Sequence, residues 1–157
     1  MAQPKKTVRH PVKQRAVAQA LRLRIVSGRW QPSERLPTRQ KLMRELDASS
    51  ITVQRACDDL VAEGFLTTRA RAGTFVHPHP PHRFAYGIVL NEGPSVFTGG
   101  LRNQALARAA AALAHRYPNR TFRSFPDVLP FPGTAGRDQL IAAVEKHQVA
   151  GLVFLNI

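Results

Sequence analysis

The sequence predicts an α+β winged helix-turn-helix domain over residues 12–76, followed by a partial α/β segment with a parallel sheet over residues 84–157. Three observations support this fold class. Two short amphipathic helices are separated by a tight break within residues 36–64. A small hairpin with a basic turn follows them. Beyond residue 83, apolar strands alternate with helices, which is typical of a parallel α/β fold.

The chain begins with a basic stretch over residues 1–11, which we predict to be a disordered tail that either contacts phosphate groups of a partner or only aids solubility. The first helix is predicted over residues 14–27 and closed by Gly28. Trp30 is expected to anchor the following loop against the core. The helix spacing places Arg15, Arg22 and Arg24 off the core face, which is formed by Val17, Ala20, Leu21 and Ile25.

Two short helices come next, marked by capping residues. Thr38 follows a proline and can accept hydrogen bonds from free N–H groups, so it starts the first of them. Ser49 caps the second in the same way, and Gly64 stands where a left-handed residue ends a helix. The apolar stripes that these two helices bury are Leu42, Met43 and Leu46, then Val53, Ala56, Cys57 and Leu60.

The face opposite the second stripe carries the groups that recognise bases. At 100° per residue, Ile51 and Arg55 point away from Val53, and Thr52 and Gln54 flank them. Hydroxyl, amide, guanidinium and methyl groups are the types that contact base edges in a major groove. Asp58 and Asp59 come one turn later and would be repelled by phosphate, so only the N-terminal half of this helix should enter a groove. The alternative is an ordinary solvated face.

The hairpin is predicted from residues 65–68 and 73–76, which read as strands around the turn Arg69-Ala70-Arg71-Ala72. Arginines in such a wing can reach phosphates or an adjacent minor groove. Beside a helix pair, the hairpin indicates a winged helix-turn-helix.

Residues 12–76 resemble the GntR-type bacterial transcription regulators. The matching pieces are Leu21…Ile25-Val26-Ser27-Gly28, Leu36-Pro37-Thr38, Leu42…Leu46, Ser49…Thr52-Val53…Ala56…Leu60…Glu63-Gly64 and Gly73-Thr74-Phe75-Val76. The family often has arginine where this chain has Gln40, Ser50 and Gln54, and its wing differs at Arg71 and Ala72. The resemblance implies binding to double-stranded DNA, but not the operator preference of other members. A homodimer is expected because a single winged helix covers only one half-site. The residues expected to bind DNA are Thr38, Arg39, Gln40, Ser49, Ser50, Ile51, Thr52, Gln54, Arg55, Arg69, Arg71 and Gly73.

Charge and composition agree with this partner. The chain has 157 residues and a net charge of +13, and residues 1–83 hold 16 Lys/Arg against 6 Asp/Glu. A basic N-terminal part without a long basic amphipathic helix favours nucleic acid over a membrane. A single cysteine, Cys57, excludes an internal disulfide and is expected to be a small core residue. Without a signal peptide or an apolar run of membrane-spanning length, we expect a cytoplasmic protein.

Residues 77–83 are predicted to be a linker, because three prolines stiffen this segment. Its histidines, His77, His79 and His82, could suggest a metal site. Alternation with proline prevents a helical or hairpin arrangement of ligands, and no cysteine or acid is close in the sequence, so no metal site is expected.

The last part is predicted as strand 84–90, helix 101–117, strand 121–125, helix 136–147 and a buried strand 149–157. GIVLNEGPSVF and VAGLVFLN resemble the first and third strands of the sensor domain of LacI-type repressors, which has the periplasmic-binding-protein fold. That resemblance implies an effector-binding domain with Asn91, Glu92 and Phe97 as candidate ligand contacts. The same loop could instead be plain surface.

Function is expected to be regulatory rather than enzymatic. Nucleotide-binding, nucleophile-elbow and zinc-protease motifs are missing, and Gly99-Gly100 before a helix is more typical of a turn than of an anion site. No cofactor is expected. We predict a sequence-specific transcription regulator, a repressor released by a small molecule such as a sugar. The alternative is a nucleic-acid-binding adaptor whose α/β segment only contacts proteins.

The α/β segment is expected to be incomplete as a sensor. A ligand cleft in this fold lies between two lobes, and residues 84–157 are fewer than the roughly 100–150 residues of an ordinary domain. We therefore expect a panel of sugars to show no binding to this chain.

Overall fold

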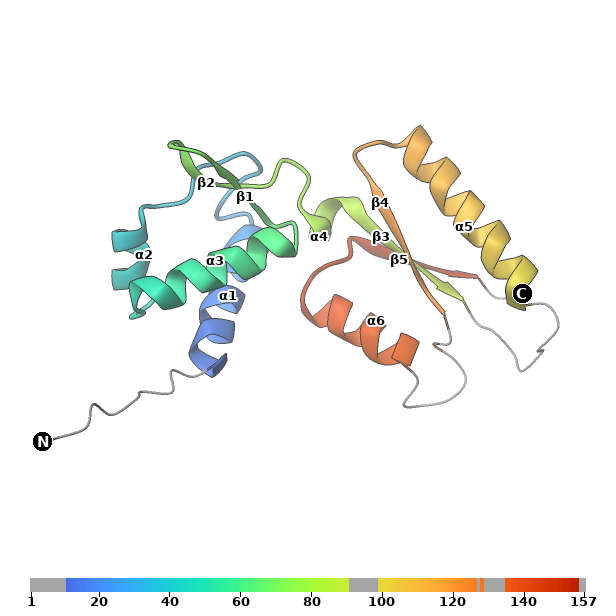
Figure 1. Ribbon diagram of the computed structural model, residues 1–157, viewed down its shortest axis with the longest axis horizontal. Helices are drawn as coiled ribbons and strands as arrows, with labels where there is room; N and C mark the ends of the chain where they lie inside the picture. Colours follow the sequence, from blue (N-terminus) through green and yellow to red (C-terminus); the bar gives the residue numbers. More distant parts are fainter. Residues whose placement is uncertain (1–10, 91–98, 127, 129–134, 156–157) are drawn as a thin grey trace, which may run out of the picture. The chain divides into compact units, whose positions relative to one another are not determined.

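The computed structural model describes residues 11–90, 99–126, 128 and 135–155 (Figure 1). The chain divides into two compact units, the N-terminal unit Met1–His77 and the C-terminal unit Pro78–Ile157. Within the described ranges, no helix combines the length and the apolar character needed to cross a membrane.

From residue 11 onward, the N-terminal unit contains three helices and a hairpin: α1 (Pro11–Val26), α2 (Arg39–Glu45), α3 (Ser50–Ala62), β1 (Leu66–Arg69) and β2 (Gly73–Val76) (Figure 1). The α1 helix begins three residues earlier than predicted, with proline as its first residue, where the missing N–H costs no helical hydrogen bond. The other four elements lie within two residues of their predicted bounds. The predicted winged helix-turn-helix is confirmed.

Capping explains where α2 and α3 begin. Thr38 accepts from the Lys41 backbone N–H, and Ser49 accepts from the Thr52 N–H at 3.3 Å, as predicted for both residues. Between the helices, Asp47 has a positive φ of 45°, which turns the chain sharply. Gly64 has a φ of 79° directly after the C-cap of α3, so it is the predicted left-handed stop.

One hydrophobic core unites α1, α3 and the hairpin. The predicted stripe residues Val53, Ala56 and Leu60 are buried against Leu21 of α1 and Phe65 at the entrance to β1. Cys57 and Met43 are only partly buried and pack against this core. Trp30 is 7% exposed, which places it in the core as expected for a loop anchor.

Arg22 corrects the prediction for α1, because it lies inside the protein at 5% exposure rather than off the core face. Its guanidinium donates to Gln19 Oε1 and to Glu63 Oε2, and it lies over the Phe65 ring at 5.5 Å from the centroid. These partners neutralise and solvate the buried charge, which would otherwise be costly. The ion pair links α1 to the end of α3.

The hairpin is antiparallel, with Leu66 opposite Val76 and Arg69 opposite Gly73. A second set of backbone bonds ties it to the segment that leads into α2. Leu36 donates to the Thr74 carbonyl at 2.9 Å, and Val76 donates to the Glu34 carbonyl at 2.8 Å. The wing and the start of α2 are therefore held together by main-chain hydrogen bonds.

The C-terminal unit is a parallel α/β arrangement: α4 (Pro81–Phe84), β3 (Ala85–Leu90), α5 (Gly99–Arg116), β4 (Thr121–Phe125), α6 (Ala135–Glu145) and β5 (Gly151–Leu155). The three strands described in this unit have the order β4-β3-β5, and β3 pairs in parallel with both neighbours. The α5 and α6 helices lie on opposite faces of the sheet (Figure 1). The predicted alternation of strands and helices is confirmed.

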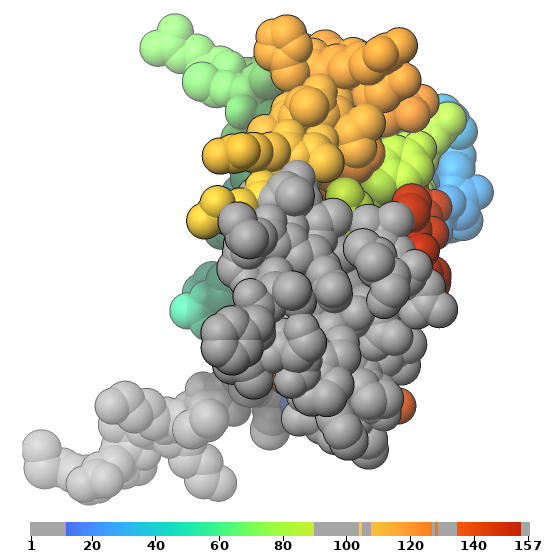
Figure 2. All heavy atoms as spheres, turned by 90° about the vertical axis from the view of Figure 1, so that its right-hand side faces the viewer, coloured from blue at the N-terminus to red at the C-terminus, as the bar shows by residue number. Residues whose placement is uncertain are grey.

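The core of this unit is small. Val89, Phe125 and Leu140 are buried in it together with Val128 and Ala143. Gly87, in the central strand, permits close packing, because a Cβ atom there would lie 2.5 Å from Leu152 Cδ2 and 2.9 Å from Phe125 Cε2. Residues 111–116 of α5 are all exposed, and the C-terminal half of this helix lies at the surface seen in Figure 2.

Two predictions for this unit need correction. The last strand is predicted to be buried, yet in the described sheet β5 is an edge strand, with Val153 49% and Phe154 60% exposed. The segment expected to be an extended linker contains the helical turn α4, which starts at Pro81 because proline suits a first helical position.

Candidate nucleic-acid interface

The N-terminal half of α3 presents the predicted base-reading residues. Ile51 is 62% exposed, and Arg55, one turn later on the same face, is also exposed. Ser49 and Thr52 are half-buried, and their hydroxyl oxygens lie 2.8 Å apart, so the N-terminal cap also orients Thr52. Ser50 is half-buried beside them. The face therefore combines an exposed apolar group, an exposed guanidinium and fixed hydroxyls.

Arg39 and Gln54 join α2 to α3 across this face. Arg39 Nη2 donates to Gln54 Oε1, and Gln54 Nε2 donates to Asp58 Oδ1 at 2.7 Å. Arg39 and Asp58 are exposed, whereas Gln54 is half-buried. Gln40, next to Arg39, is exposed and carries an uncharged amide where the resemblance would suggest arginine.

A groove of about 280 Å³ lies where α2, α3 and the wing meet. We call it the wing groove. Four residues predicted to bind DNA, from three separate elements, lie on its walls, which shows that the fold brings them together. Its lining consists of Arg35, Leu36, Pro37, Thr38, Arg39, Leu42, Gln54, Cys57, Gly73 and Thr74.

The wing adds positive charge beside the groove. Arg69 and Arg71 are both exposed, and the Arg69 guanidinium lies 4.8 Å from the centroid of the Phe75 ring. Arg71 has a φ of 59°, so the tip of the wing adopts a left-handed turn without glycine. The predicted residues Ile51, Arg55, Arg69 and Arg71 do not line the groove; they are exposed outside it.

The prediction missed Arg35, which lines the wing groove. Its side chain lies against Gly73: a Cβ atom there would be 3.2 Å from Arg35 Nε, and the φ of Gly73 is 109°. Glycine is thus favoured at position 73 by its backbone conformation, and a Cβ atom there would also require the Arg35 side chain to shift slightly. In the sequence, Arg35 is marked only as a basic residue directly before Leu36-Pro37. Its proximity to the wing depends on an isolated β-bridge between Arg35 and Phe75, which are 40 residues apart.

Cys57 lines the groove as a protonated thiol. Burial is the largest cause that raises its pKa, from 9.0 to about 11; Asp58 raises it further, and Arg39 opposes the change. The thiolate is therefore scarce at neutral pH, and thiolate is the reactive form.

We expect Cys57 in the folded chain to react with a thiol reagent at pH 8 far more slowly than in the urea-unfolded chain. Because the folded pKa is the higher one, the thiol contributes stability that is complete below about pH 9 and is lost as pH rises towards about 11. Stopped-flow labelling across that pH range measures the first effect, and urea unfolding at matched pH measures the second. Equal labelling rates in the folded and unfolded chains would contradict this prediction.

The candidate effector residues Asn91, Glu92 and Phe97 lie outside the described residues. The structure therefore provides no geometry for them. The described part of the C-terminal unit supplies the sheet whose first strand they follow.

Three helices, a wing and a basic groove together define the N-terminal unit as a winged helix-turn-helix domain. The sequence profile of the bacterial regulatory proteins of the gntR family matches residues 13–76. Over these residues the winged helix-turn-helix unit is therefore similar to the GntR family.

Relatives of known name share this region. The HTH-type transcriptional regulator TauR of Rhodobacter capsulatus is 44% identical over 57 residues, which are 36% of this chain and 12% of TauR. The histidine utilization repressor of Pseudomonas putida is 38% identical over 118 residues, which cover 69% of this chain and 47% of the repressor. The second alignment is longer than the N-terminal unit and so continues into the C-terminal unit. The chain spans about half or less of the length of these relatives.

A solved structure, the N-terminal domain of AraR in complex with a mutant ORR3, is also similar. The two sequences are 33% identical, and the superposition has a TM-score of 0.40. The matched region covers 41% of the present chain and 91% of the AraR chain.

Proposed function

We propose that this chain is a sequence-specific regulator of transcription that binds double-stranded DNA through the N-terminal unit and acts as a repressor. The observation that carries this proposal is the wing groove, where the basic side chains of Arg35 and Arg39 lie with the amide of Gln54 beside the start of β2 in the wing. In this arrangement α3 enters the major groove with its N-terminal half, and the wing arginines contact the backbone.

The proposed division of roles follows from exposure. Ile51, Thr52, Gln54 and Arg55 face the base edges, with Ser49 and Ser50 at the helix start. The basic groups around these base-reading residues, and the exposed ends of α2 and the wing, contact the phosphates and position the domain. The residues with this second role are Thr38, Arg39, Gln40, Arg69, Arg71 and Gly73, to which the structure adds Arg35.

We propose a homodimer as the DNA-bound form. A single winged helix covers one half-site, and useful specificity in a genome needs more contacts than one half-site supplies. Selection of binding sites from random duplexes with the full chain tests both proposals. We expect an enriched, roughly palindromic sequence whose half-sites are protected together in footprinting. Enrichment of no sequence would refute the regulator, and protection of one unrepeated half-site by a monomer would refute the dimer.

We also propose that the C-terminal unit belongs to a small-molecule sensor of the periplasmic-binding-protein type, with a sugar as the effector class. The parallel order β4-β3-β5 supports this assignment, because in such sheets ligands bind beyond the carboxyl ends of the strands. Isothermal titration of this chain with sugars measures whether the unit binds a ligand by itself. Histidine is included because three relatives are named histidine utilization repressors. Micromolar binding would show that the C-terminal unit as present in this chain is sufficient to bind the effector.

The adaptor function has less support. The relatives that match this chain are named as regulators and repressors. The two functions differ at residues 91–100, which must contact a ligand in a sensor but need not do so in an adaptor.

A further inference from the structure

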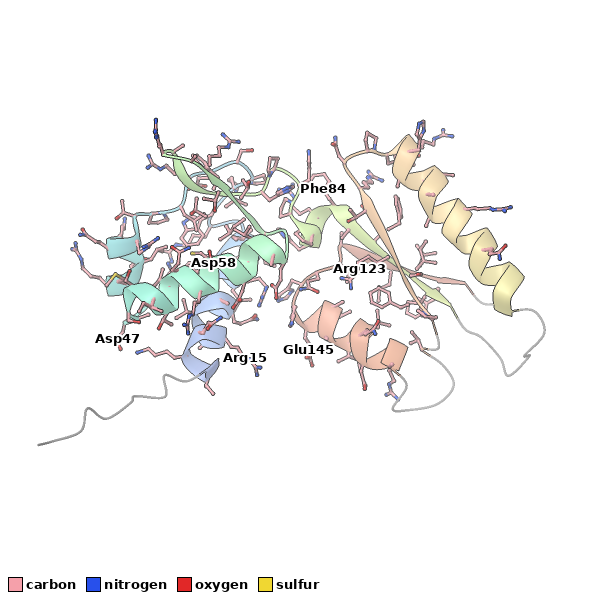
Figure 3. All side chains as sticks on the ribbon, in the orientation of Figure 1. Arg15, Asp47, Asp58, Phe84, Arg123 and Glu145 are labelled. Carbon is pink, nitrogen blue, oxygen red and sulfur yellow. The ribbon has the colours of Figure 1, made fainter. Side chains whose placement is uncertain are left out.

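Asp58 lies at a position where a negative charge is unexpected in a DNA-binding surface. It is exposed on α3, one turn beyond the base-reading residues (Figure 3). Its carboxylate would be repelled by phosphate, so the sequence alone marks it as the limit of the contact surface. In the structure it instead accepts a hydrogen bond at 2.7 Å from Gln54 Nε2.

The Gln54 amide is hydrogen-bonded on one side to a group that can only donate and on the other side to a group that can only accept. The guanidinium of Arg39 has only donors and bonds to Gln54 Oε1, whereas the carboxylate of Asp58 has only acceptors and bonds to Gln54 Nε2. Rotating the amide by 180° would turn its N–H groups towards the guanidinium and its oxygen towards the carboxylate. Both contacts would become repulsive, so the two charges fix one orientation of the amide.

The amide retains one donor and one acceptor for a ligand. A carboxamide has two N–H donors and two lone pairs on oxygen, and Asp58 and Arg39 use one of each. In the major groove, adenine presents an acceptor, N7, beside a donor, the N6 amino group. Guanine presents two acceptors there, and a fixed amide matches only one of them.

We propose that Asp58 is a specificity-determining residue: together with Arg39 it fixes the Gln54 carboxamide so that this amide reads an adenine. This inference rests on the proposed function. Asp58 acts as a positioning residue, since it touches Gln54 and not the base. Its repulsion of phosphate lowers the affinity for all sequences, while the fixed amide raises discrimination at one base pair.

The test compares variants of the full chain on the duplex selected by the wild type and on duplexes changed at one base pair at a time. Asp58→Asn keeps the shape of the side chain but removes the charge. Asp47→Asn is the matched control, because it removes the same charge from an exposed position in the same unit (Figure 3). Asparagine also tolerates the positive φ of 45° at position 47.

Both charge-removing variants should bind non-specific duplexes somewhat more tightly than the wild type and to a similar extent. Only Asp58→Asn should lose preference at one A·T pair, by about 2- to 13-fold, the range for one net hydrogen bond. Asp58→Ala, which removes the acceptor, should lose at least as much at that pair. Gln54→Ala should lose preference at the same pair by about 5- to 150-fold, the range for one bidentate base contact. Adding Asp58→Asn to Gln54→Ala should cause no further loss there.

The possible failures are distinguishable. If Asp58→Asn and Asp58→Ala behave like Asp47→Asn at every base pair, Asp58 has no positioning role and the proposed regulator stands. If Gln54→Ala keeps every preference, Gln54 reads no base and the inference is overturned. If the wild type selects no sequence at all, the proposed function itself fails.

Discussion

The Arg22→Met variant should lose about 3 kcal/mol of unfolding free energy in the N-terminal unit. Methionine fills a similar volume but leaves Glu63 without the guanidinium that now pairs with it. Removing one partner of a buried ion pair usually costs 3–5 kcal/mol, and we expect the lower end because the Glu63 side chain retains 20% exposure. The loss should weaken the attachment of α3 to α1.

Urea unfolding followed by tryptophan fluorescence measures this effect in the intact chain. Trp30 is the single tryptophan and is buried in the N-terminal core, so its signal reports on that unit. Lys13→Met is the control, because the Lys13–Asp47 pair is exposed, with a separation of 3.4 Å. That variant should change stability by less than about 1 kcal/mol. Equal losses in both variants would show that the buried pair has no special contribution.

The Arg55→Ala variant should change which base is preferred at one position of the operator. If the contact is bidentate to guanine, discrimination there should fall by about 1–3 kcal/mol. Arg55 is exposed on the face of α3 that enters the groove, and Arg69 is exposed on the wing. Arg69→Ala should therefore act differently: it should weaken binding to all duplexes alike and reduce the dependence on salt.

Competition binding at several salt concentrations separates the two effects. Each variant is measured on the selected duplex, on single-base changes of it and on an unrelated duplex. Arg69→Ala serves as the comparison for Arg55→Ala, since both remove one exposed arginine. If both variants lose specific and non-specific affinity equally, the division into base-reading and backbone-binding residues is wrong.

The elements of the N-terminal unit were predictable because their signals are local. Thr38 and Ser49 each bond to an N–H group three residues later, and Gly64 acts at its own φ angle. Arg22 was misplaced because its burial depends on Glu63, 41 residues away in the sequence. Helical spacing shows where a side chain projects, but it cannot show that an acid from another helix will meet it.

The same distinction applies to the candidate site. The polar face of α3 follows from spacing within one helix, and its exposure at Ile51 agrees with the prediction. The contact of Arg39 with Gln54 joins residues 15 apart across two helices, and the place of Arg35 in the groove requires the wing to fold back. In the C-terminal unit, strand positions could be predicted from apolar runs, whereas the exposure of Phe154 depends on which strand lies at the edge.

The main-chain bonds between residues 34–36 and the second strand of the wing have a mechanical consequence. The same short segment leads directly into α2, so these hydrogen bonds join the wing to the helix pair. We expect this link to restrict the distance between the backbone contacts made by the wing and by α2. DNA sequences that bend or compress easily should therefore bind better than stiff ones, even at base pairs that no side chain touches.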